Sequence, residues 1–270
     1  MVCQVELICI GNELLIGKTL NTNAHWLSKR ITSLGCIVRR TTVVRDEISE
    51  IVASTREAIA RKPDFIIITG GLGPTFDDMT LEGVAKALSR KLEMNDEALE
   101  MLRERYAEFT KMGRIKDSNL TEYRLKMARL PQGARPIHNP VGTAPGVTIH
   151  ENSTTILVLP GVPQEMEAIF EASIIHLLRD KSDGLFYVER SLQVLGVVES
   201  SLAALIDRVM LEYPAIYIKS HPIGSEPEVH IELHLTTSSR NKEGAEEEIS
   251  KAMEKIQVLI SQKGGRTGFV

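Results

Sequence analysis

The sequence predicts an α/β fold: a doubly wound, mainly parallel sheet, followed in the chain by a second, smaller α+β domain. Apolar runs typical of strands alternate with helical patterns over the first 70 residues, as in right-handed βαβ units. The run Phe65–Thr69 is apolar on both faces, which suits a sheet covered by helices on each side. After residue 184 the order changes to strand, helix, strand, strand, helix.

The first domain is expected over residues 1–180. Short apolar runs indicate its strands, and apolar residues spaced three and four apart indicate its helices. The strands are predicted at 3–10, 36–44, 65–69, 147–150 and 154–159, and the helices at 23–34, 47–61, 81–88, 96–111, 118–130 and 163–178. Pro163 opens the last of these helices, where proline is well tolerated.

The second domain is expected over residues 184–262. The pattern predicts strands at 185–195, 215–220 and 229–236 and helices at 199–211 and 243–259. The remaining segment, 263–270, contains Gly264, Gly265 and Gly268 and is predicted to be a flexible tail.

Composition excludes several classes of protein. The net charge is −4, so the chain lacks the basic field of a general nucleic-acid binder, and we expect no nucleic-acid partner. No segment approaches the roughly 18 consecutive apolar residues of a membrane span, and no leader pattern opens the chain. We therefore expect a cytoplasmic protein without a membrane partner. Its three cysteines, Cys3, Cys9 and Cys36, form no C-x-x-C pair and are expected to be small buried side chains.

The glycine-rich loop from Thr69 to Asp78 carries the strongest functional signal. It follows a predicted parallel strand, at the end where ligands bind to open α/β sheets. Three glycines allow main-chain amides to approach an anion, a proline stiffens the turn, and two adjacent carboxylates can hold a hard cation against phosphate: Gly70, Gly71, Gly73, Pro74, Asp77 and Asp78. Alternatively, Asp78 or Thr80 caps the next helix, although capping leaves the glycines unexplained.

Two other patterns are weaker. The segment Gly11–Thr19 is similar to a P-loop, but five residues instead of four separate its glycines, and the chain has no G-x-G-x-x-G dinucleotide motif. His230, Glu232 and His234 share one face of a predicted strand, as a metal triad or as the solvent side of a half-buried strand. Helix charges such as Arg103 and Arg105 are expected to be solvated.

Several ordered motifs together resemble the N-terminal domain of the competence/damage-inducible CinA family, which has the molybdopterin-binding, MoaB/MogA-like fold. The motifs cover about the first 180 residues, and the rest is similar to the small α+β module that follows in this family. They are Gly11-Asn-Glu-Leu-Leu-x-Gly17 with Asn21 and Asn23; Thr69-Gly-Gly-Leu-Gly-Pro-Thr-x-Asp-Asp-x-Thr80; Lys126-Met-Ala128; Asn139-Pro-Val-Gly-Thr-Ala-Pro-Gly146; and Leu159-Pro-Gly-Val-Pro-x-Glu-Met166.

The resemblance implies a small-molecule nucleotide ligand across Gly70–Thr80, with the loops 139–146 and 161–165 closing the pocket. Family members of this type act as ADP-ribose pyrophosphatases that need a divalent cation, often Co²⁺, and are aided by K⁺; relatives hydrolyse FAD. Longer members carry an amidase domain to which nothing here corresponds, so deamidation is not expected. Relatives commonly form homo-oligomers. Where many relatives have Lys-Gln-Ala, this chain has Met127 in the middle, which leaves any hydrogen bond from that glutamine without a counterpart.

These arguments assign roles to individual residues. We expect Asp77 and Asp78 to bind Co²⁺, Mg²⁺ or Mn²⁺, with Glu13 as a third carboxylate or base. The expected ligand-binding residues are Asn21, Thr69, Gly70, Gly71, Gly73, Pro74, Thr75, Thr80, Lys126, Asn139, Gly142, Thr143, Gly146, Gly161, Val162, Pro163 and Glu165.

The predicted function is metal-dependent hydrolysis of a nucleoside-diphosphate sugar such as ADP-ribose. Two rival functions share the same loop. One is a molybdopterin-binding protein of molybdenum-cofactor assembly, and the other is a regulatory protein that binds nucleotides without turnover.

Overall fold

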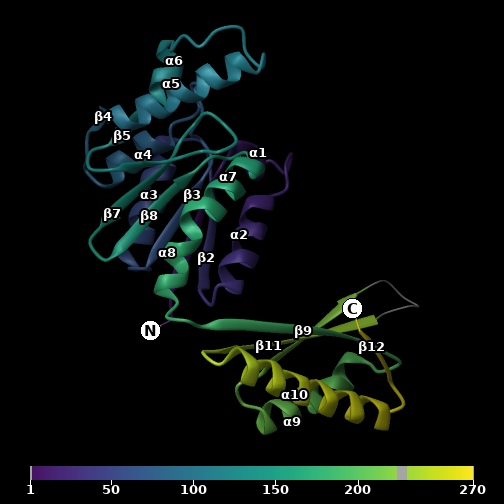
Figure 1. Ribbon diagram of the computed structural model, residues 1–270. Helices are drawn as coiled ribbons and strands as arrows, with labels where there is room; N and C mark the ends of the chain where they lie inside the picture. Colours follow the sequence, from purple (N-terminus) through teal and green to yellow (C-terminus); the bar gives the residue numbers. More distant parts are fainter. Residues whose placement is uncertain (1, 224–229, 270) are drawn as a thin grey trace. The chain divides into compact units, whose positions relative to one another are not determined.

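The computed structural model describes residues 2–223 and 230–269. The chain divides into two compact units (Figure 1). The first comprises residues 1–32 and 36–182, and the second comprises residues 33–35 together with the chain from residue 183 onward. Each unit is described on its own below.

The first unit is built on a six-stranded sheet. Its order is β2 (Ile37–Val44), β1 (Gln4–Ile10), β3 (Phe65–Thr69), β8 (Thr154–Leu159), β7 (Gly146–Glu151) and β6 (Arg135–Ile137). The first four strands are parallel, whereas β7 pairs antiparallel with both β8 and β6. The predicted mainly parallel α/β fold is confirmed, as is the hairpin of β7 and β8.

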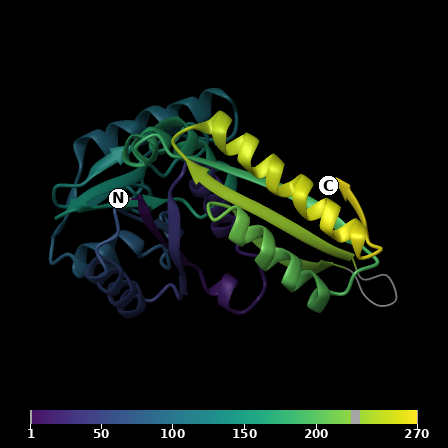
Figure 2. The ribbon, with the colours of Figure 1, turned by 90° about the horizontal axis from the view of Figure 1, so that it is seen from below.

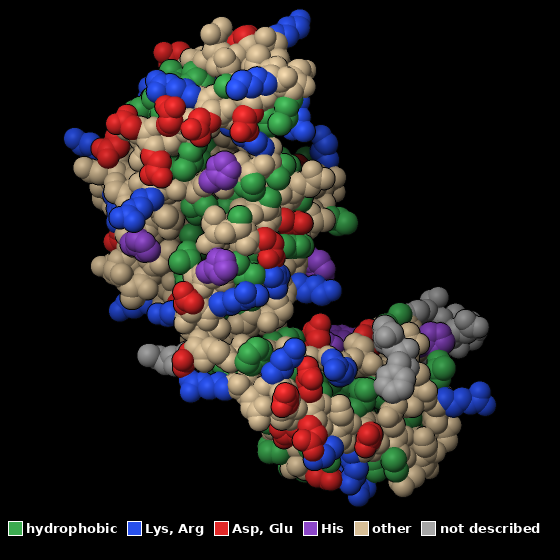
Figure 3. Space-filling model, viewed as in Figure 1, with side chains coloured by type: hydrophobic (Ala, Val, Ile, Leu, Met, Phe, Trp, Pro, Cys, Tyr) green, Lys and Arg blue, Asp and Glu red, His purple; other side chains and the backbone are tan. Residues whose placement is uncertain are grey.

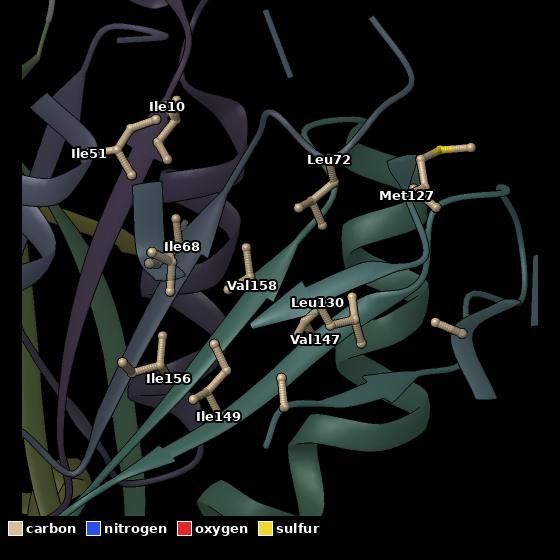
Figure 4. Close-up of a cluster of buried hydrophobic side chains, with 14 of the residues drawn as sticks. Ile10, Ile51, Ile68, Leu72, Met127, Leu130, Val147, Ile149, Ile156 and Val158 are labelled. Atoms are coloured by element: carbon tan, nitrogen blue, oxygen red, sulfur yellow. The ribbon is translucent and has the colours of Figure 1, made fainter. Parts of the chain in front are cut away.

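Helices cover both faces of this sheet. The helices are α1 (Asn12–Leu15), α2 (Thr22–Ser33), α3 (Ile48–Ala60), α4 (Thr80–Ala87), and a continuous helical stretch made of α7 (Pro163–Ile169), a π-helical turn (Phe170–Ile174) and α8 (Ile175–Lys181). Alternate strand residues face a core under α3 and α4, which Figure 4 shows with Ile51 beside Ile10 and Ile68. On α2, Trp26 meets Phe170 of the π-helical turn edge to face, with ring centroids 5.3 Å apart.

Residues 88–134 add a small layer beyond the sheet. It holds α5 (Asp96–Lys111), α6 (Glu122–Lys126) and a two-stranded antiparallel ribbon of β4 (Leu92–Met94) and β5 (Arg129–Pro131). The predicted helix 118–130 is therefore wrong at both ends. Thr121 caps a shorter helix through its side chain, and the chain becomes extended by Arg129 because Leu130 turns into the core beside β4.

The second unit is a split βαβ fold. Its elements run β9 (Phe186–Leu195), α9 (Glu199–Glu212), β10 (Tyr217–Ile223), β11 (His230–Ser239), α10 (Lys242–Gln262) and β12 (Arg266–Phe269), and the antiparallel sheet has the order β10, β11, β9, β12. Figure 2 shows α9 and α10 along one face of this sheet, where apolar side chains form a separate core. The start of the predicted strand 229–236 lies outside the described residues.

The predicted flexible tail is wrong for residues 266–269. They form β12, which pairs antiparallel with residues 192–195 of β9. Gly265 is the reason that the chain can return to the sheet here, because a side chain at this position would collide with Val197 and Ile260. A glycine-rich segment that resembles a tail in the sequence thus supplies the fourth strand.

In the first unit, the parallel strands β1, β3 and β8 end side by side, and Gly70 lies where they meet. The Gly70 amide donates to the carbonyl of Leu159 at 3.0 Å. Its φ is +102°, and a Cβ there would lie 2.2 Å from the carbonyl oxygen of Ile10. A Cβ on Gly161, which follows β8, would lie 3.2 Å from the Gly70 Cα. The three strand ends can approach this closely only with glycine at position 70.

We predict that Gly70→Ala destabilises the protein by about 2–6 kcal/mol, since backbone strain and overpacking each cost about 1–3 kcal/mol. Gly113→Ala is the matched control: its φ is +69°, but a Cβ there meets nothing within 4 Å. We expect this control to cost about 1–2 kcal/mol, the penalty of the backbone conformation alone. Urea unfolding of both variants measures the difference, and equal losses would contradict the crowding at Gly70.

Candidate functional site

A cavity of about 330 Å³ opens in front of the glycine-rich loop. It lies where the parallel strands end, the position at which open α/β sheets bind ligands. One wall comes from the loop after β3 and the other from the segment that leads from β8 into α7. The lining residues are Gly71, Leu72, Gly73, Pro74, Asp78, Met127, Thr143, Ala144, Pro160, Gly161, Val162 and Glu165. We call this space the loop cavity.

Three main-chain amides of the loop have no hydrogen-bond partner in the described protein. Within the described chain, the N–H groups of Gly71, Leu72 and Gly73 donate to no protein acceptor. The loop nevertheless keeps a fixed course, because the Thr80 amide donates to the Gly71 carbonyl at 3.2 Å. Consecutive free amides beside a cavity form a site for an anion.

Thr75 joins the two acidic residues of the loop. Its amide donates to Asp78 Oδ2 at 2.8 Å, and its hydroxyl lies 2.6 Å from the same oxygen and in hydrogen-bond contact with Asp77 Oδ1. The hydrogen bond from Thr75 lowers the pKa of the Asp77 carboxyl below its ordinary value, with a smaller contribution from the positive charge of Lys126. Lys126 Nζ donates to the Thr75 carbonyl oxygen. The turn therefore holds two carboxylates and one ammonium group close together.

These carboxylates fit a cation that is shared with a ligand better than a resident metal ion. In residues 2–223 and 230–269, no group of three or more His, Cys, Asp and Glu side chains is placed to hold a metal ion. The expected third carboxylate, Glu13, lines a different cavity from Asp78. A Mg²⁺-like ion held by one or two carboxylates completes its coordination with phosphate oxygens and water. Asp77 and Asp78 can supply these one or two carboxylate ligands and no more.

Thr80 holds the loop instead of facing it. Its side chain is fully buried at the start of α4, and its hydroxyl donates to the Gly70 carbonyl at 2.8 Å. A Cβ on Gly71, whose φ is +64°, would lie 2.2 Å from the Thr80 hydroxyl oxygen. The expected direct contact of Thr80 with phosphate is thus replaced by a positioning role.

The loop 139–146 is organised by Asn139. Its side-chain amide donates to Glu165 Oε2 and to the Ala144 carbonyl, each at 2.8 Å, and its oxygen accepts from the amides of Val141 and Gly142. Gly142 lies so close to Glu165 that a Cβ would overlap the carboxylate. Of the expected contacts in this loop, Thr143 lines the loop cavity, whereas Asn139 and Gly142 are buried supports.

Two further residues of this region differ from expectation. Gly146 belongs to β7 and packs against Ile137, Leu159 and Ile169, so it supports the sheet and does not line the cavity. Arg105 of α5 was expected to be solvated but donates to the carbonyls of Gly142 at 2.9 Å and Pro140 at 2.7 Å. This arginine ties the outer helical layer to the loop 139–146.

A second, smaller cavity of about 80 Å³ lies on the other side of Gly70. We call it the N-terminal cavity because its polar lining comes largely from the segment 13–23. Its lining includes the expected residues Glu13, Asn21, Thr69, Gly70, Gly161 and Pro163, together with Ile10, Leu14, Thr19, Leu20, Thr22 and Asn23. Gly161 lines both cavities. A third hollow of about 150 Å³ adjoins the loop cavity and is lined by Lys126 and by five loop-cavity residues.

The alternative motifs take on ordinary structure. Residues Asn12–Leu15 form one helical turn, α1, where a P-loop would need a phosphate nest. On β11, His234 lies 3.3 Å from Glu189 of β9, as expected for the polar face of a half-buried strand, and the described residues hold no metal cluster there. Figure 3 shows acidic and basic side chains interspersed on the face that it presents.

Sequence reasoning missed part of the site because its signals are tertiary. Leu72 and Met127 provide apolar walls, yet each is also a core residue by its pattern. Asn23 is buried on α2 and reaches Gly161 at 2.8 Å, a contact across 138 residues. Neither relation follows from local spacing.

No helix in the part of the chain that the structure describes is long and apolar enough to cross a membrane.

Comparison with known proteins agrees with this geometry. The family described as a probable molybdopterin binding domain matches residues 6–180. A protein of Metallosphaera sedula is 43% identical over 266 residues, 98% of this chain and 97% of its own, and one of Sulfurisphaera tokodaii is 46% identical over 96% of each chain. A crystal structure of the protein CinA, described as of unknown function, from Thermoplasma acidophilum superposes with a TM-score of 0.59 and 41% identity, covering 65% of this chain and 98% of that one. The chain therefore belongs to the molybdopterin-binding domain family, in its CinA-like branch with the MoaB/MogA-like fold.

Proposed function

We propose that this protein binds a nucleoside-diphosphate sugar such as ADP-ribose in the loop cavity and hydrolyses its phosphoanhydride. One observation carries the proposal: three consecutive residues whose main-chain amides have no protein partner, Gly71 to Gly73, line a cavity that the carboxylate residues Asp78 and Glu165 also line. Backbone donors of this kind stabilise negative charge that develops on an oxygen, and they need no rearrangement to do so.

The rest of the cavity suits the heterocycle of a nucleotide. Leu72, Met127 and Val162 contribute apolar surface, and Pro74 and Pro160 add rigid edges. Thr143 and Glu165 offer polar groups at the far wall, and Glu165 is already oriented by Asn139. A mainly apolar pocket with a few fixed polar groups is the usual form of a small-molecule site.

The turn that contains Asp77 and Asp78 would bind the phosphate end of the ligand. The hydrogen bond from Thr75 lowers the pKa of Asp77, and Asp78 lies against Gly73, where a Cβ would be 2.6 Å from its Oδ2. A divalent cation bound between these carboxylates and the ligand (Co²⁺, Mg²⁺ or Mn²⁺) would neutralise phosphate charge and activate water. Lys126 adds a positive charge on the other side of Thr75. K⁺ as an accessory ion stays a proposal from the family resemblance.

A second candidate function has its own support. The family that matches residues 6–180 is described as molybdopterin-binding, and a pterin with a phosphate group would use the same amides and apolar walls. A nucleotide sensor without turnover is the third. Fold and pocket shape are common to all three, so ligand and turnover measurements must separate them.

We predict that Asp78→Ala lowers cation-dependent release of AMP from ADP-ribose by at least about 100-fold, because it removes a carboxylate that holds the cation. The fold should remain intact, because the two hydrogen bonds that this substitution removes, from the Thr75 amide and hydroxyl, lie in an exposed loop. Product release is measured by chromatography with Co²⁺, Mg²⁺ and Mn²⁺, against FAD, NADH and molybdopterin as other ligands.

Asp207→Ala, an exposed carboxylate of α9, is the control for this variant and should retain full activity. Undiminished turnover by Asp78→Ala would remove its assigned role. Binding of molybdopterin without binding of ADP-ribose by the unsubstituted protein would favour the pterin function, and ADP-ribose binding without product would favour the sensor.

The pH dependence of activity provides a separate prediction. Thr75 lowers the pKa of Asp77, so the carboxylate stays ionised to a lower pH than an ordinary aspartate. Thr75→Val removes this hydrogen bond, which raises that pKa and should move the acid limb of kcat/KM to higher pH. Thr75→Ser keeps the hydroxyl and should leave the limb in place. An unchanged acid limb in Thr75→Val would show that ionisation of Asp77 does not govern activity.

A further inference from the structure

The loop cavity contains a carboxylate that the protein holds in place. Glu165 lies in the first turn of α7, is half-buried and lines the cavity. Its Oε2 atom accepts a hydrogen bond from the side-chain nitrogen of Asn139 at 2.8 Å. The carboxylate also packs against Gly142, where a Cβ would lie 2.0 Å from Oε2. These two contacts restrict where the negative charge can lie.

The partner of this carboxylate, Asn139, is itself fixed. Its side chain is 4% exposed and makes four hydrogen bonds, which is the full capacity of an amide group. The nitrogen donates to Glu165 and to the Ala144 carbonyl, and the oxygen accepts from the amides of Val141 and Gly142. A flipped amide would lose all four bonds, so the orientation of Asn139 is determined, and with it the position of Glu165.

Glu165 still has a free oxygen. Within the described part of the chain, it forms no ion pair, and its Oε1 atom accepts no hydrogen bond. Glu171, on the same helical stretch, differs because Arg30 donates to both of its oxygens. A carboxylate accepts hydrogen bonds, cannot donate them, and repels other anions. The free side of Glu165 therefore favours a part of the ligand that carries hydroxyl or N–H donors.

The cavity lining has two other polar side chains, and neither has this property. The hydroxyl of Thr143 can donate as well as accept, so it does not distinguish a donor from an acceptor. Asp78 belongs to the turn proposed to bind the phosphate end, and its Oδ2 already accepts from the amide and the hydroxyl of Thr75. Among the cavity side chains, Glu165 is therefore the fixed acceptor that lies away from the phosphate turn.

The chemistry of a nucleotide indicates which part meets this acceptor. A ribose carries two adjacent hydroxyls, both able to donate, and acidic side chains bind ribose hydroxyls in other nucleotide-binding α/β folds. Adenine instead has ring nitrogens beside its amino group, and these accept hydrogen bonds. Leu72 and Met127, 5% and 3% exposed, give the cavity an apolar wall that suits the base. The polar wall of Thr143 and Glu165 then suits the sugar.

We propose that Glu165, positioned by Asn139, accepts hydrogen bonds from the 2′- and 3′-hydroxyls of the ribose that carries the base, so that the loop cavity selects ribonucleotides over 2′-deoxyribonucleotides. This inference rests on the proposed nucleotide-binding function and deepens it by specifying the sugar. Glu165 is the residue that touches the ligand. Asn139 is a positioning residue, because it acts on the ligand through Glu165.

The test compares ADP with 2′-deoxy-ADP, which differ by one hydroxyl. Titration calorimetry with the full chain and Mg²⁺ measures the binding of each, and chromatography checks that the nucleotides stay intact. We expect the unsubstituted protein to bind ADP at least about 10-fold more tightly, the contribution of one hydrogen bond to a charged group. Glu165→Gln keeps an oxygen for Asn139 but presents N–H donors to the ligand, so it should make the two affinities nearly equal.

Two further variants separate this role from a structural one. Glu167→Gln is the matched control, because it makes the same change on α7 outside the cavity lining, and it should retain the preference for ADP. Asn139→Ala releases the carboxylate and should reduce the preference, whereas a purely structural role would weaken both nucleotides equally. If Asn139→Ala fails to fold, Glu165→Gln decides, since it preserves the hydrogen bond between the two side chains.

Several results would overturn this inference while leaving the proposed function intact. They are equal binding of the two nucleotides by the unsubstituted protein, a preference that persists in Glu165→Gln, and loss of the preference in Thr143→Val alone. A GDP titration tests the base: tighter binding of GDP than of ADP that Glu165→Gln removes would show that the carboxylate binds the base instead. If the unsubstituted protein binds neither ADP nor ADP-ribose, the proposed function fails and this inference fails with it.

Discussion

The close approach of three strand ends at Gly70 is the constraint on which the rest of the site depends. Ile10 at the end of β1 lies against Gly70, Gly161 after β8 lies against its other side, and the Gly70 amide is consumed by Leu159. Because position 70 adopts a positive φ, the chain turns away from the sheet immediately after β3. The next three amides, of Gly71, Leu72 and Gly73, then have no strand partner within the described chain, and their residues line the loop cavity.

The surrounding structure preserves this arrangement from several directions. Thr80 holds the base of the loop, Thr75 gathers the acidic turn, and Arg105 fastens the facing loop from the outer helical layer. Each of these side chains is satisfied by the protein. The main-chain amides of Gly71, Leu72 and Gly73, by contrast, have no partner within the described chain and belong to residues that line the loop cavity. A site whose supporting side chains are already hydrogen-bonded within the protein, and whose loop amides have no partner, is preorganised for binding.

Local patterns predicted much of this molecule. The run Phe65–Thr69 and its glycine-rich loop were recognisable because a buried strand, three glycines and paired acids are adjacent in sequence. The sequence did not predict that Glu13 and Asp78 line different cavities. Glu13 follows β1 and Asp78 follows β3, so their proximity depends on how the segments after two different strands are placed. Arg105 and Asn23 act over 37 and 138 residues, which no spacing rule covers.

The segments whose secondary structure was predicted wrongly also depend on tertiary contacts. Residues 266–269 look mobile by composition, yet β9 offers them an open edge, and tertiary pairing overrides the weak local preference of glycine. The stretch from residue 118 to 130 has helical composition, but Leu130 is needed in the core and pairs beside β4. Helix propensity of a few tenths of a kcal/mol per residue is smaller than the roughly 2 kcal/mol gained by burying a leucine.

The central claim is that the amides after Gly70 bind the anionic part of a nucleotide. Amide chemical shifts of Gly71, Leu72 and Gly73, followed by ¹H–¹⁵N correlation spectra during titration with ADP-ribose, test it most directly. The account predicts that these three signals move downfield together and saturate with the ligand. Saturating binding that leaves all three signals in place would contradict it.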